Sequence, residues 1–229
     1  MKDIKKIYAI IPAHNEEKNI AAIVKKARKH IDNIIVVDDG SKDKTKELAE
    51  KAGAIVLTHI VNLGKGAALK TGCDFAFEKG AEYIVALDAD AQHNPDDIPR
   101  FVEKLKKYDI VFSYRKASSQ MPFVLRFGNW LISGIVSLLY GVRLNDTQSG
   151  FRAFSSLAYN KIRWNALDYS MESEIISRAG KQRLKYVQIP IQTIYSDKYK
   201  GTTIIDGVKI VLNMFWWKFG YEKDRLQGK

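Results

Sequence analysis

The chain has few of the features that mark secreted or membrane-spanning proteins. It has one cysteine, Cys73, so an internal disulfide is impossible and nothing indicates an oxidising compartment. Its longest apolar stretch, residues 130–142, is broken by serine and glycine and falls short of the roughly 20 residues that cross a bilayer. The N-terminal apolar run is too short for a signal peptide. We therefore expect a cytoplasmic protein without a transmembrane helix, in which Cys73 is a small buried side chain.

The chain is long enough for one large α/β domain. Of its 229 residues, 46% are hydrophobic and 28% are charged, which suits a substantial core. Runs typical of strands alternate with helical patterns, and this alternation predicts a mostly parallel sheet flanked by helices. The strands are expected at residues 6–11, 34–37, 54–57, 82–87 and 110–113, and the helices at 17–30, 43–52, 65–79 and 95–107. Beyond residue 114 the pattern changes to a helix over 122–140 and short strands near 151–154 and 184–191.

Acidic residues follow three of the expected strands. Glu16 comes after the first apolar run, Asp38 and Asp39 end the second, and Asp88 follows the run 83–87. Ligands of open parallel sheets bind outside the carboxyl ends of the strands. We therefore expect Glu16, Asp39 and Asp88 to face one shared pocket.

The segment Asp88-Ala89-Asp90-Ala91-Gln92 predicts a site for a hard divalent cation. In an extended chain Asp88, Asp90 and Gln92 point to the same side, because side chains alternate with a period of two. Mg²⁺ and Mn²⁺ prefer such oxygen ligands and fill their remaining positions with water and phosphates. The alternative is that Asp88 caps the next helix and Asp90 is a solvated loop residue.

The glycine-containing segment 62–66 is not a standard phosphate loop. Leu69 stands where G-x-G-x-x-G requires its third glycine, and the G-K-[ST] ending of a P-loop is absent. The segment instead predicts a helix start whose backbone N–H groups favour an anion. Lys65 is expected near that anion.

Five motifs in this order, PAHNEE, VVDDGS, NLGKGAALKTG, DADAQHNP and DTQSGFRAF, resemble family 2 of the nucleotide-sugar glycosyltransferases. The resemblance runs from about residue 7 to residue 191. Within the family the chain is most similar to the polyprenyl- and dolichyl-phosphate hexose synthases, such as dolichyl-phosphate mannose synthase and dolichyl-phosphate glucosyltransferase. It implies a GT-A fold, Rossmann-like, in a single domain over residues 1–200. Residues 1–114 would bind the nucleotide sugar and 115–200 the acceptor.

The resemblance also implies roles for individual residues. The nucleotide sugar would be held by Pro12, Ala13, Asn15, Glu16, Asp38, Asp39, Lys65 and Asp88. The metal and diphosphate would be held by Asp88, Asp90 and Gln92, with Asp90 counted as catalytic. Asn15 and Asp38 have helix capping as their alternative.

Arginines in the second half suit an acceptor phosphate. Arg115 follows the strand at 110–113 and Arg126 lies in the next helix, and both resemble arginines that grip the acceptor phosphate in the family. The planar guanidinium donates two parallel hydrogen bonds to a phosphate. A surface salt bridge is the alternative for each. Ser133 and Lys200 are the further acceptor residues, with close helix packing as the alternative for Ser133.

The element DTQSGFRAF predicts architecture that supports the site. Asp146 would position the loop, Gly150 would allow a tight turn and Arg152 would pair with an acid. Glu172 and Glu174 resemble the acidic helix start of the family, which favourable charge at a helix N-terminus explains.

The chemistry of a phosphate acceptor predicts the mechanism. A phosphate monoester is an anion at neutral pH and needs no general base to attack the anomeric carbon. Asp88 and Asp90 would hold Mg²⁺ or Mn²⁺ against the leaving diphosphate, while Arg115 and Arg126 align the acceptor for displacement with inversion. If the acceptor is a sugar hydroxyl, Glu174 or His93 is the candidate base.

The excess of positive over negative charge lies in the second half of the chain. Residues 1–100 hold 16 basic and 16 acidic residues, whereas 101–229 hold 21 basic and 10 acidic ones. Residues 201–229 read as an amphipathic helix and a basic tail, with Trp216 and Trp217 beside the apolar face. We expect peripheral contact with an anionic membrane on its cytoplasmic face; burial of the helix against the domain or in a dimer is the alternative.

Other functions remain as alternatives. The main one is a family 2 enzyme that acts on a non-lipid glycan. A sugar nucleotidyltransferase would need a glycine-rich nucleotide loop near the first strand, which PAHNEE does not supply. Nucleic-acid binding is not expected, because the acidic strand ends repel phosphate backbones. The sequence leaves the donor open between GDP-mannose and UDP-glucose.

Overall fold

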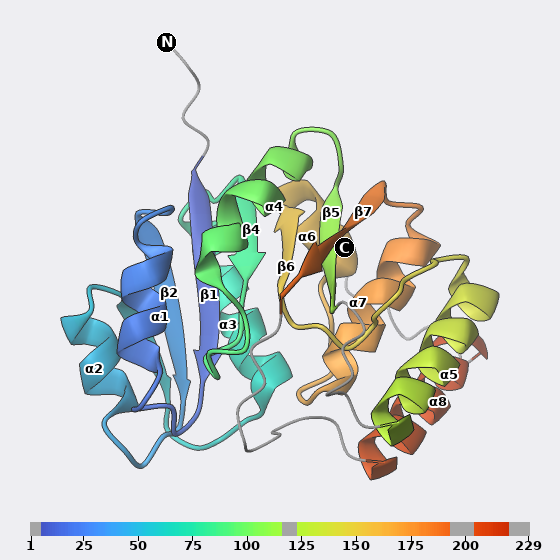
Figure 1. The fold of residues 1–229 in the computed structure, drawn as a ribbon, viewed down its shortest axis with the longest axis horizontal. Coiled ribbons are helices and arrows are strands. Elements are labelled where there is room, and N and C mark those ends of the chain that lie inside the picture. Colours follow the sequence, from blue (N-terminus) through green and yellow to red (C-terminus); the bar gives the residue numbers. More distant parts are fainter. Residues whose placement is uncertain (1–5, 116–122, 193–203, 220–229) are drawn as a thin grey trace, which may run out of the picture.

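The strands of residues 6–115, 123–192 and 204–219, which the computed structural model describes, join into one seven-stranded sheet (Figure 1). Their spatial order is β3-β2-β1-β4-β6-β5-β7. Neighbours are parallel except that β6 is antiparallel to both β4 and β5. The strands are β1 (Ile7–Ala13), β2 (Asn33–Asp39), β3 (Ile55–His59), β4 (Tyr83–Ala86), β5 (Ile110–Arg115), β6 (Arg152–Ser155) and β7 (Tyr186–Ile191).

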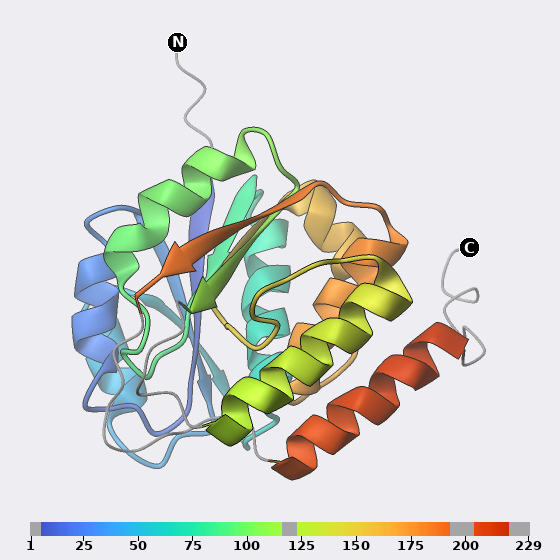
Figure 2. The ribbon, with the colours of Figure 1, turned by 45° about the vertical axis from the view of Figure 1, so that its right-hand side comes forward.

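Helices cover both faces of this sheet (Figures 1 and 2). One face carries α1 (Ile20–Ala27), α2 (Thr45–Lys51) and α4 (Ile98–Leu105), the last preceded by the 3₁₀ turn η1 (Pro95–Asp97). On the other side lie α3 (Lys65–Glu78), α6 (Ser156–Ile162) and α7 (Ser170–Lys181), with α5 (Phe123–Tyr140) and α8 (Ile204–Phe219) packed against α7 and against each other.

Alternation along the buried strands explains these two layers. In β1, Tyr8 and Ile10 join one hydrophobic core, whereas Ala9 and Ile11 join the other. Successive side chains of a strand point to opposite faces, so a continuous apolar run serves a sheet that is covered on both sides. Cys73 is buried in the first of these cores, as expected.

The sequence-based expectations of an α/β fold with a mostly parallel sheet in a single domain are confirmed. The expected division at residue 114 is not a boundary of the sheet, because β6 lies between β4 and β5 and β7 lies beyond β5 in the same sheet. The division into donor and acceptor parts stays a prediction. The antiparallel direction of β6 is a feature that the local sequence pattern did not predict.

The C-terminal helix α8 packs on the domain with one face. Met214 is fully buried, and its carbonyl oxygen accepts a 2.6 Å hydrogen bond from the Tyr140 hydroxyl of α5. Lys209 pairs with Asp168, which precedes α7. The opposite face leaves Trp216 73% exposed. Within the described ranges, no helix combines the length and apolarity that a membrane crossing requires.

Gly72 allows α3 to approach the sheet, and this generates a stability prediction. A Cβ at Gly72 would collide with the side chain of Ile10, a β-branched residue of β1 that cannot turn away. We expect Gly72→Ala to lower the free energy of unfolding by about 1–3 kcal/mol through overpacking. Urea denaturation followed by circular dichroism measures this change.

Gly134→Ala is the matched control for this substitution. Gly134 lies in α5, and a Cβ there would meet nothing within 4 Å. Replacing it should leave stability unchanged or raise it by up to about 1 kcal/mol, because alanine favours the helix. Equal stability of the Gly72 variant and the wild type would contradict the close-packing explanation.

Candidate active site

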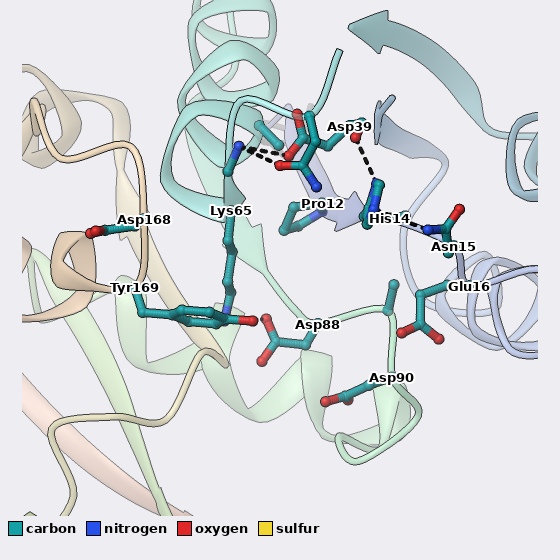
Figure 3. A pocket seen from close by; sticks show the side chains of 15 residues that line it. Pro12, His14, Asn15, Glu16, Asp39, Lys65, Asp88, Asp90, Asp168 and Tyr169 are labelled. Carbon is teal, nitrogen blue, oxygen red and sulfur yellow. Dashed lines mark hydrogen bonds and ion pairs between the residues drawn. The ribbon is translucent and has the colours of Figure 1, made fainter. Parts of the chain in front are cut away.

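A cavity of about 460 Å³ opens at the carboxyl ends of β1, β2 and β4 (Figure 3). The parallel register brings these strand ends to one edge, with Ala13 beside Asp38 and Asp39 beside His59. Glu16, Asp39 and Asp88 all line the cavity, as the sequence predicted. The lining residues are Pro12, Ala13, His14, Asn15, Glu16, Asp39, Asn62, Gly64, Lys65, Ala68, Asp88, Ala89, Asp90, Asp168 and Tyr169.

Hydrogen bonds between the loops after β1 and β2 shape one wall. The Asn15 backbone, at φ 55°, donates to Ser41 Oγ at 2.9 Å, and Asn15 Oδ1 accepts from the Lys42 N–H at 2.9 Å. The Glu16 N–H donates to Thr45 Oγ1 at 2.8 Å. Asn15 therefore joins two loops, and it tolerates the left-handed conformation better than most residues.

Asp39 anchors the turn that leads into α3. Its carboxylate accepts from the backbone N–H groups of Leu63 and Gly64 at 2.9 and 2.8 Å, and it contacts His59 Nδ1 at 2.7 Å. Gly64 has φ 99°, and the Leu167 carbonyl fills the space that a Cβ would need. Asp39 thus fixes the start of α3 while its carboxylate still lines the cavity.

Asp38 lies outside the cavity lining. It is 3% exposed, and its Oδ1 accepts from the Ser41 N–H at 3.2 Å. This contact lies in the turn after β2, whereas α2 begins only at Thr45, so Asp38 does not cap that helix. Its assignment to nucleotide binding stays a prediction.

Lys65, the first residue of α3, joins two carboxylates. Its Nζ lies 2.7 Å from Asp88 Oδ1 and 2.9 Å from Glu172 Oε1. Burial alone would lower the pKa of Lys65, yet the charges of Asp88 and Glu172 outweigh burial and raise it. In the same way, burial opposes ionisation of Asp88, but Lys65 lowers the pKa of Asp88 to about 2. The bridge is therefore fully charged at neutral pH.

Asp90 has the opposite electrostatic environment. Burial and the neighbouring charge of Asp88 raise the pKa of Asp90 to about 6. The segment that carries it is bent, with Ala91 at φ 61°, so the expected extended geometry of residues 88–92 does not hold. The Gln92 N–H turns back to Asp90 Oδ1 at 3.0 Å, and Gln92 is not among the lining residues. The assignment of Gln92 as a metal ligand stays a prediction.

The donor set fits a divalent cation that also uses ligands from a substrate. In the described part of the chain, no three histidine, cysteine, aspartate or glutamate side chains gather into a metal site. Asp88 and Asp90 do line the same cavity, and burial together with the charge of Asp88 keeps the pKa of Asp90 high. Mg²⁺ and Mn²⁺ bind through one or two carboxylates together with water and phosphates, so the pair has the right chemistry.

The lack of a side chain at Gly150 leaves room for the Asp88 carboxylate. A Cβ at Gly150 would overlap the Asp88 carboxylate. The loop that holds Gly150 is in turn fixed by Ser149, whose Oγ lies 2.5 Å from Ser113 Oγ of β5. The DTQSGFRAF element therefore supports the acidic site through contact with Asp88.

Arg115 forms a two-point ion pair with Asp146. Arg115 Nε and Nη2 donate to the two Asp146 oxygens at 2.6 and 3.2 Å. Asp146 is 4% exposed, so this pair is the salt-bridge alternative for Arg115, although it is largely buried. Neither residue is in the cavity lining.

The remaining acceptor residues lie partly beyond what the structure describes. Arg126 and Ser133 are both in α5, seven residues apart and hence near one face of the helix. The Ser133 hydroxyl is buried without a hydrogen-bond partner. The Arg126 side chain and the whole of Lys200 lie outside the described part. All four acceptor assignments stay predictions.

The two residues considered as general bases, Glu174 and His93, form hydrogen bonds outside the cavity. Glu174 accepts from the backbone N–H groups of Asn165 and Ala166 and from Arg178 Nε, at 2.8–3.1 Å. Burial lowers the pKa of His93 to about 4, and its Nδ1 accepts from the Asp88 N–H at 3.4 Å. Neither side chain lines the cavity.

Among the lining residues that sequence reasoning did not assign, His14, Asp168 and Tyr169 have side chains with chemistry of their own. His14 contacts the Asp39 carbonyl at 2.8 Å through Nδ1, and Tyr169 places its ring 5.6 Å from Lys65 Nζ. Asp168 joins them from the loop before α7. His14 lay within the PAHNEE motif, which was a usable signal. Asp168 and Tyr169 directly precede the acidic helix start at Glu172, but only folding brings them to the cavity.

The contrast between Asp88 and Asp90 predicts opposite effects on stability. Burial and Asp88 raise the pKa of Asp90 from the ordinary 3.8 to about 6, so stability falls as the pH rises from about 3.8 to about 6, and the full cost of the Asp90 charge is present above that. Asp90→Asn should therefore raise the free energy of unfolding at pH 8 by about 1–3 kcal/mol. Asp88→Asn should lower it by about 2–4 kcal/mol, because the buried Lys65 ammonium loses one of its two charged partners. Urea titrations give both values.

The pH dependence provides the control for these two variants. Near pH 4, Asp90 is protonated in the folded state and about half protonated in the unfolded state, where its pKa is close to the ordinary 3.8, so the gain of Asp90→Asn should shrink. The lowered pKa of Asp88 keeps its contribution present there and removes it only as the pH falls further toward about 2. Destabilisation by both variants at pH 8 would show that the two carboxylates do not have opposed environments.

Comparison with known proteins assigns the family. Residues 8–173 match "Glycosyl transferase family 2". An uncharacterized protein of Methanocaldococcus jannaschii is 40% identical, covering 93% of this chain and 92% of the relative. The UDP-N-acetylglucosamine–dolichyl-phosphate N-acetylglucosaminyltransferase of Methanococcus voltae is 38% identical, covering 94% and 97%.

The fold is also found among solved structures. Glucosyl-3-phosphoglycerate synthase of Mycobacterium tuberculosis, in complex with phosphoglyceric acid, superposes with a TM-score of 0.75 at 20% identity, covering 93% of this chain and 81% of that one. A second structure of that enzyme, in complex with Mn²⁺, UDP and glucosyl-3-phosphoglycerate, gives 0.72. The fold is thus the expected GT-A type, and the chain belongs to glycosyl transferase family 2.

Proposed function

We propose that this protein transfers a sugar from a nucleotide diphosphate sugar to a polyprenyl or dolichyl phosphate, with inversion and with the help of Mg²⁺ or Mn²⁺. The observation that carries the proposal is the cavity at the strand ends, where Asp88, Asp90 and Lys65 lie beside the wall formed by Pro12 and Asp39. Alignments with relatives named as dolichyl- and undecaprenyl-phosphate transferases cover 94–98% of the length of this chain. They support a lipid phosphate as the acceptor.

The donor would bind along the loops after β1 and β2. Asn15 and Glu16 lie in the first loop, and the buried Asp39 lies at the end of β2, where its carboxylate can accept from a base N–H or a ribose hydroxyl. A divalent cation held by Asp88 and Asp90 would neutralise charge on the departing diphosphate. The relative from Methanococcus voltae adds UDP-N-acetylglucosamine to GDP-mannose and UDP-glucose as a donor to test.

The acceptor phosphate would meet arginine and hydroxyl groups from the second half. Asp146 holds the Arg115 guanidinium by two contacts, which fixes the orientation of its donors. The unpartnered Ser133 hydroxyl offers a donor on α5, the helix that also carries Arg126. Holding the phosphate in line with the anomeric carbon would contribute to the rate enhancement.

The absence of a free base among the candidates favours an anionic nucleophile. A phosphate monoester can attack without losing a proton, whereas a sugar hydroxyl needs a base. Glu174 is bound by two backbone N–H groups and Arg178, and His93 is buried with a pKa of about 4. The burial of these two groups therefore supports a phosphate acceptor over a glycan hydroxyl.

The neighbouring helices α5 and α8 supply a surface for peripheral membrane contact (Figure 2). Both expose large apolar side chains: Leu131 and Leu138 on α5, and Leu212, Phe215 and Trp216 on α8. Exposed apolar groups beside a basic half suit an anionic bilayer surface. We therefore propose a peripheral location on the cytoplasmic face, where the lipid phosphate is presented.

Transfer of labelled sugar into lipid tests this function. The full-length protein is incubated with polyprenyl phosphate, Mg²⁺ or Mn²⁺, and a panel of labelled UDP- and GDP-sugars. We expect an organic-extractable product whose formation EDTA abolishes and whose donor identifies the nucleotide sugar. Asp90→Ala should reduce turnover by more than about 100-fold, because the metal loses a carboxylate.

Asp96→Ala is the control for the Asp90 substitution. Asp96 lies in the same acidic segment but is outside the cavity and pairs with His30 at the surface. Its loss should leave turnover near the wild-type value. Activity on soluble sugars without any lipid product would overturn the lipid acceptor in favour of a glycan, and full activity of the Asp90 variant would overturn the metal assignment.

Arg126 should affect the acceptor far more than the donor. We expect Arg126→Ala to raise the KM for polyprenyl phosphate by about 10-fold or more, because the acceptor phosphate loses a charge-assisted hydrogen-bond donor. The nucleotide affinity, measured by calorimetry, should stay within about twofold of the wild-type value. The exposed Arg143, in the loop after α5, provides a control as Arg143→Ala. An equal loss of lipid use and nucleotide affinity would indicate a structural role for Arg126.

A further inference from the structure

The ammonium group of Lys65 forms an ion pair with Asp88, a carboxylate that the proposed metal requires as a ligand. Lys65 Nζ is 2.7 Å from Asp88 Oδ1, and Figure 3 shows the side chain running past the Tyr169 ring toward Asp88. The cavity is otherwise acidic: of its described lining residues, Lys65 is the only lysine or arginine, against Glu16, Asp39, Asp88, Asp90 and Asp168. Lys65 thus supplies the positive charge of this cavity in the absence of a metal.

The second contact of Lys65 is anchored in the core. Glu172 is 2% exposed and lies 2.9 Å from Lys65 Nζ on one side and 3.8 Å from Arg152 Nη2 on the other. Arg152 is 1% exposed, and its Nε and Nη1 atoms have no hydrogen-bond partner. Two cations therefore hold the Glu172 charge deep in the domain, where no ligand reaches it.

The two ends of the bridge differ in access. The Asp88 side chain is 20% exposed and lines the cavity, whereas Glu172 does not line it. A divalent cation bound at Asp88 and an ammonium group on the same carboxylate would repel each other strongly in such a partly buried site. One of them has to leave Asp88 when the other binds.

We propose that Lys65 and the divalent cation exchange on Asp88. In the metal-free protein the Lys65 ammonium pairs with Asp88 and Glu172. When the metal and a nucleoside diphosphate bind, the ammonium leaves Asp88, remains paired with Glu172 and contacts a diphosphate oxygen. Glu172 is then a positioning residue that retains Lys65 during the exchange. This inference rests on the proposed metal-assisted use of a nucleotide sugar, and it adds that the metal binds well only together with the nucleotide.

Mn²⁺ titration of the full-length protein at pH 8, followed by the electron paramagnetic resonance signal of free Mn²⁺, tests the exchange. Without nucleotide, Lys65→Met should bind Mn²⁺ about tenfold more tightly than the wild type, because no ammonium competes for Asp88. Glu172→Gln should bind it more weakly, because Lys65 then rests on Asp88 alone. With UDP or GDP present, Lys65→Met should lose about tenfold in nucleotide affinity, because the diphosphate loses a cation.

Two further variants separate charge from structure. Lys65→Arg retains a cation and should keep the weak Mn²⁺ binding of the wild type. Lys70→Met removes a lysine of the same helix that is outside the cavity, and it should change neither affinity. Thermal unfolding of each variant identifies those that are folded.

The outcomes distinguish this inference from the function on which it rests. If folded Lys65→Met binds Mn²⁺ no more tightly than the wild type, or if Lys65→Met and Glu172→Gln shift Mn²⁺ affinity in the same direction, the exchange is wrong. Failure of the wild type to bind Mn²⁺ with any nucleotide tested would instead overturn the proposed metal site itself.

Discussion

The contact of Lys65 with Asp88 and Glu172 is the interaction on which the rest of the site depends. It connects α3, the β4 end and α7, which are distant in sequence. The backbone reinforces the connection, since the Ala67 N–H donates to the Leu167 carbonyl and the Trp164 indole donates to the Gly66 carbonyl. Glycine at position 66 is needed there because the facing backbone occupies the place of a Cβ. The cavity is thus closed by contacts in which charge and close packing act together.

Much of the fold follows from the local sequence pattern. The five apolar runs of the first half are all strands of the sheet, and the acids that follow three of them line one cavity because parallel strands end at the same edge. The helices expected at 17–30, 43–52, 65–79 and 95–107 are present as α1, α2, α3 and η1 with α4. Their ends were less accurate: α1 begins at Ile20 and ends at Ala27, because capping and turn contacts decide the last residues.

The details of the site depend on contacts that no local pattern contains. Asp146, which pairs with Arg115, is 31 residues away, and Glu172, one of the two partners of Lys65, is 107 residues away, so neither pair follows from spacing along a helix or strand. The bend at Ala91 was missed because alanine rarely adopts positive φ and gives no turn signal. Likewise, the short run 152–155 carried no sign of its direction, which is set by pairing with β4 and β5.

The antiparallel strand β6 has a consequence for how such a protein can change. Because β6 pairs with β5 in a hairpin-like arrangement, the chain leaves the sheet at Arg115 and re-enters it at Arg152, beside its point of departure; Ser113 and Phe151 are hydrogen-bonded at 2.6 Å. Apart from residues 146–150, which contact Arg115, Ser113 and Asp88, the intervening segment, which includes α5, can therefore lengthen, shorten or change composition without shifting the register of any strand. Recognition of the second substrate can then diverge during evolution while the edge of the sheet that holds Asp39 and Asp88 stays the same.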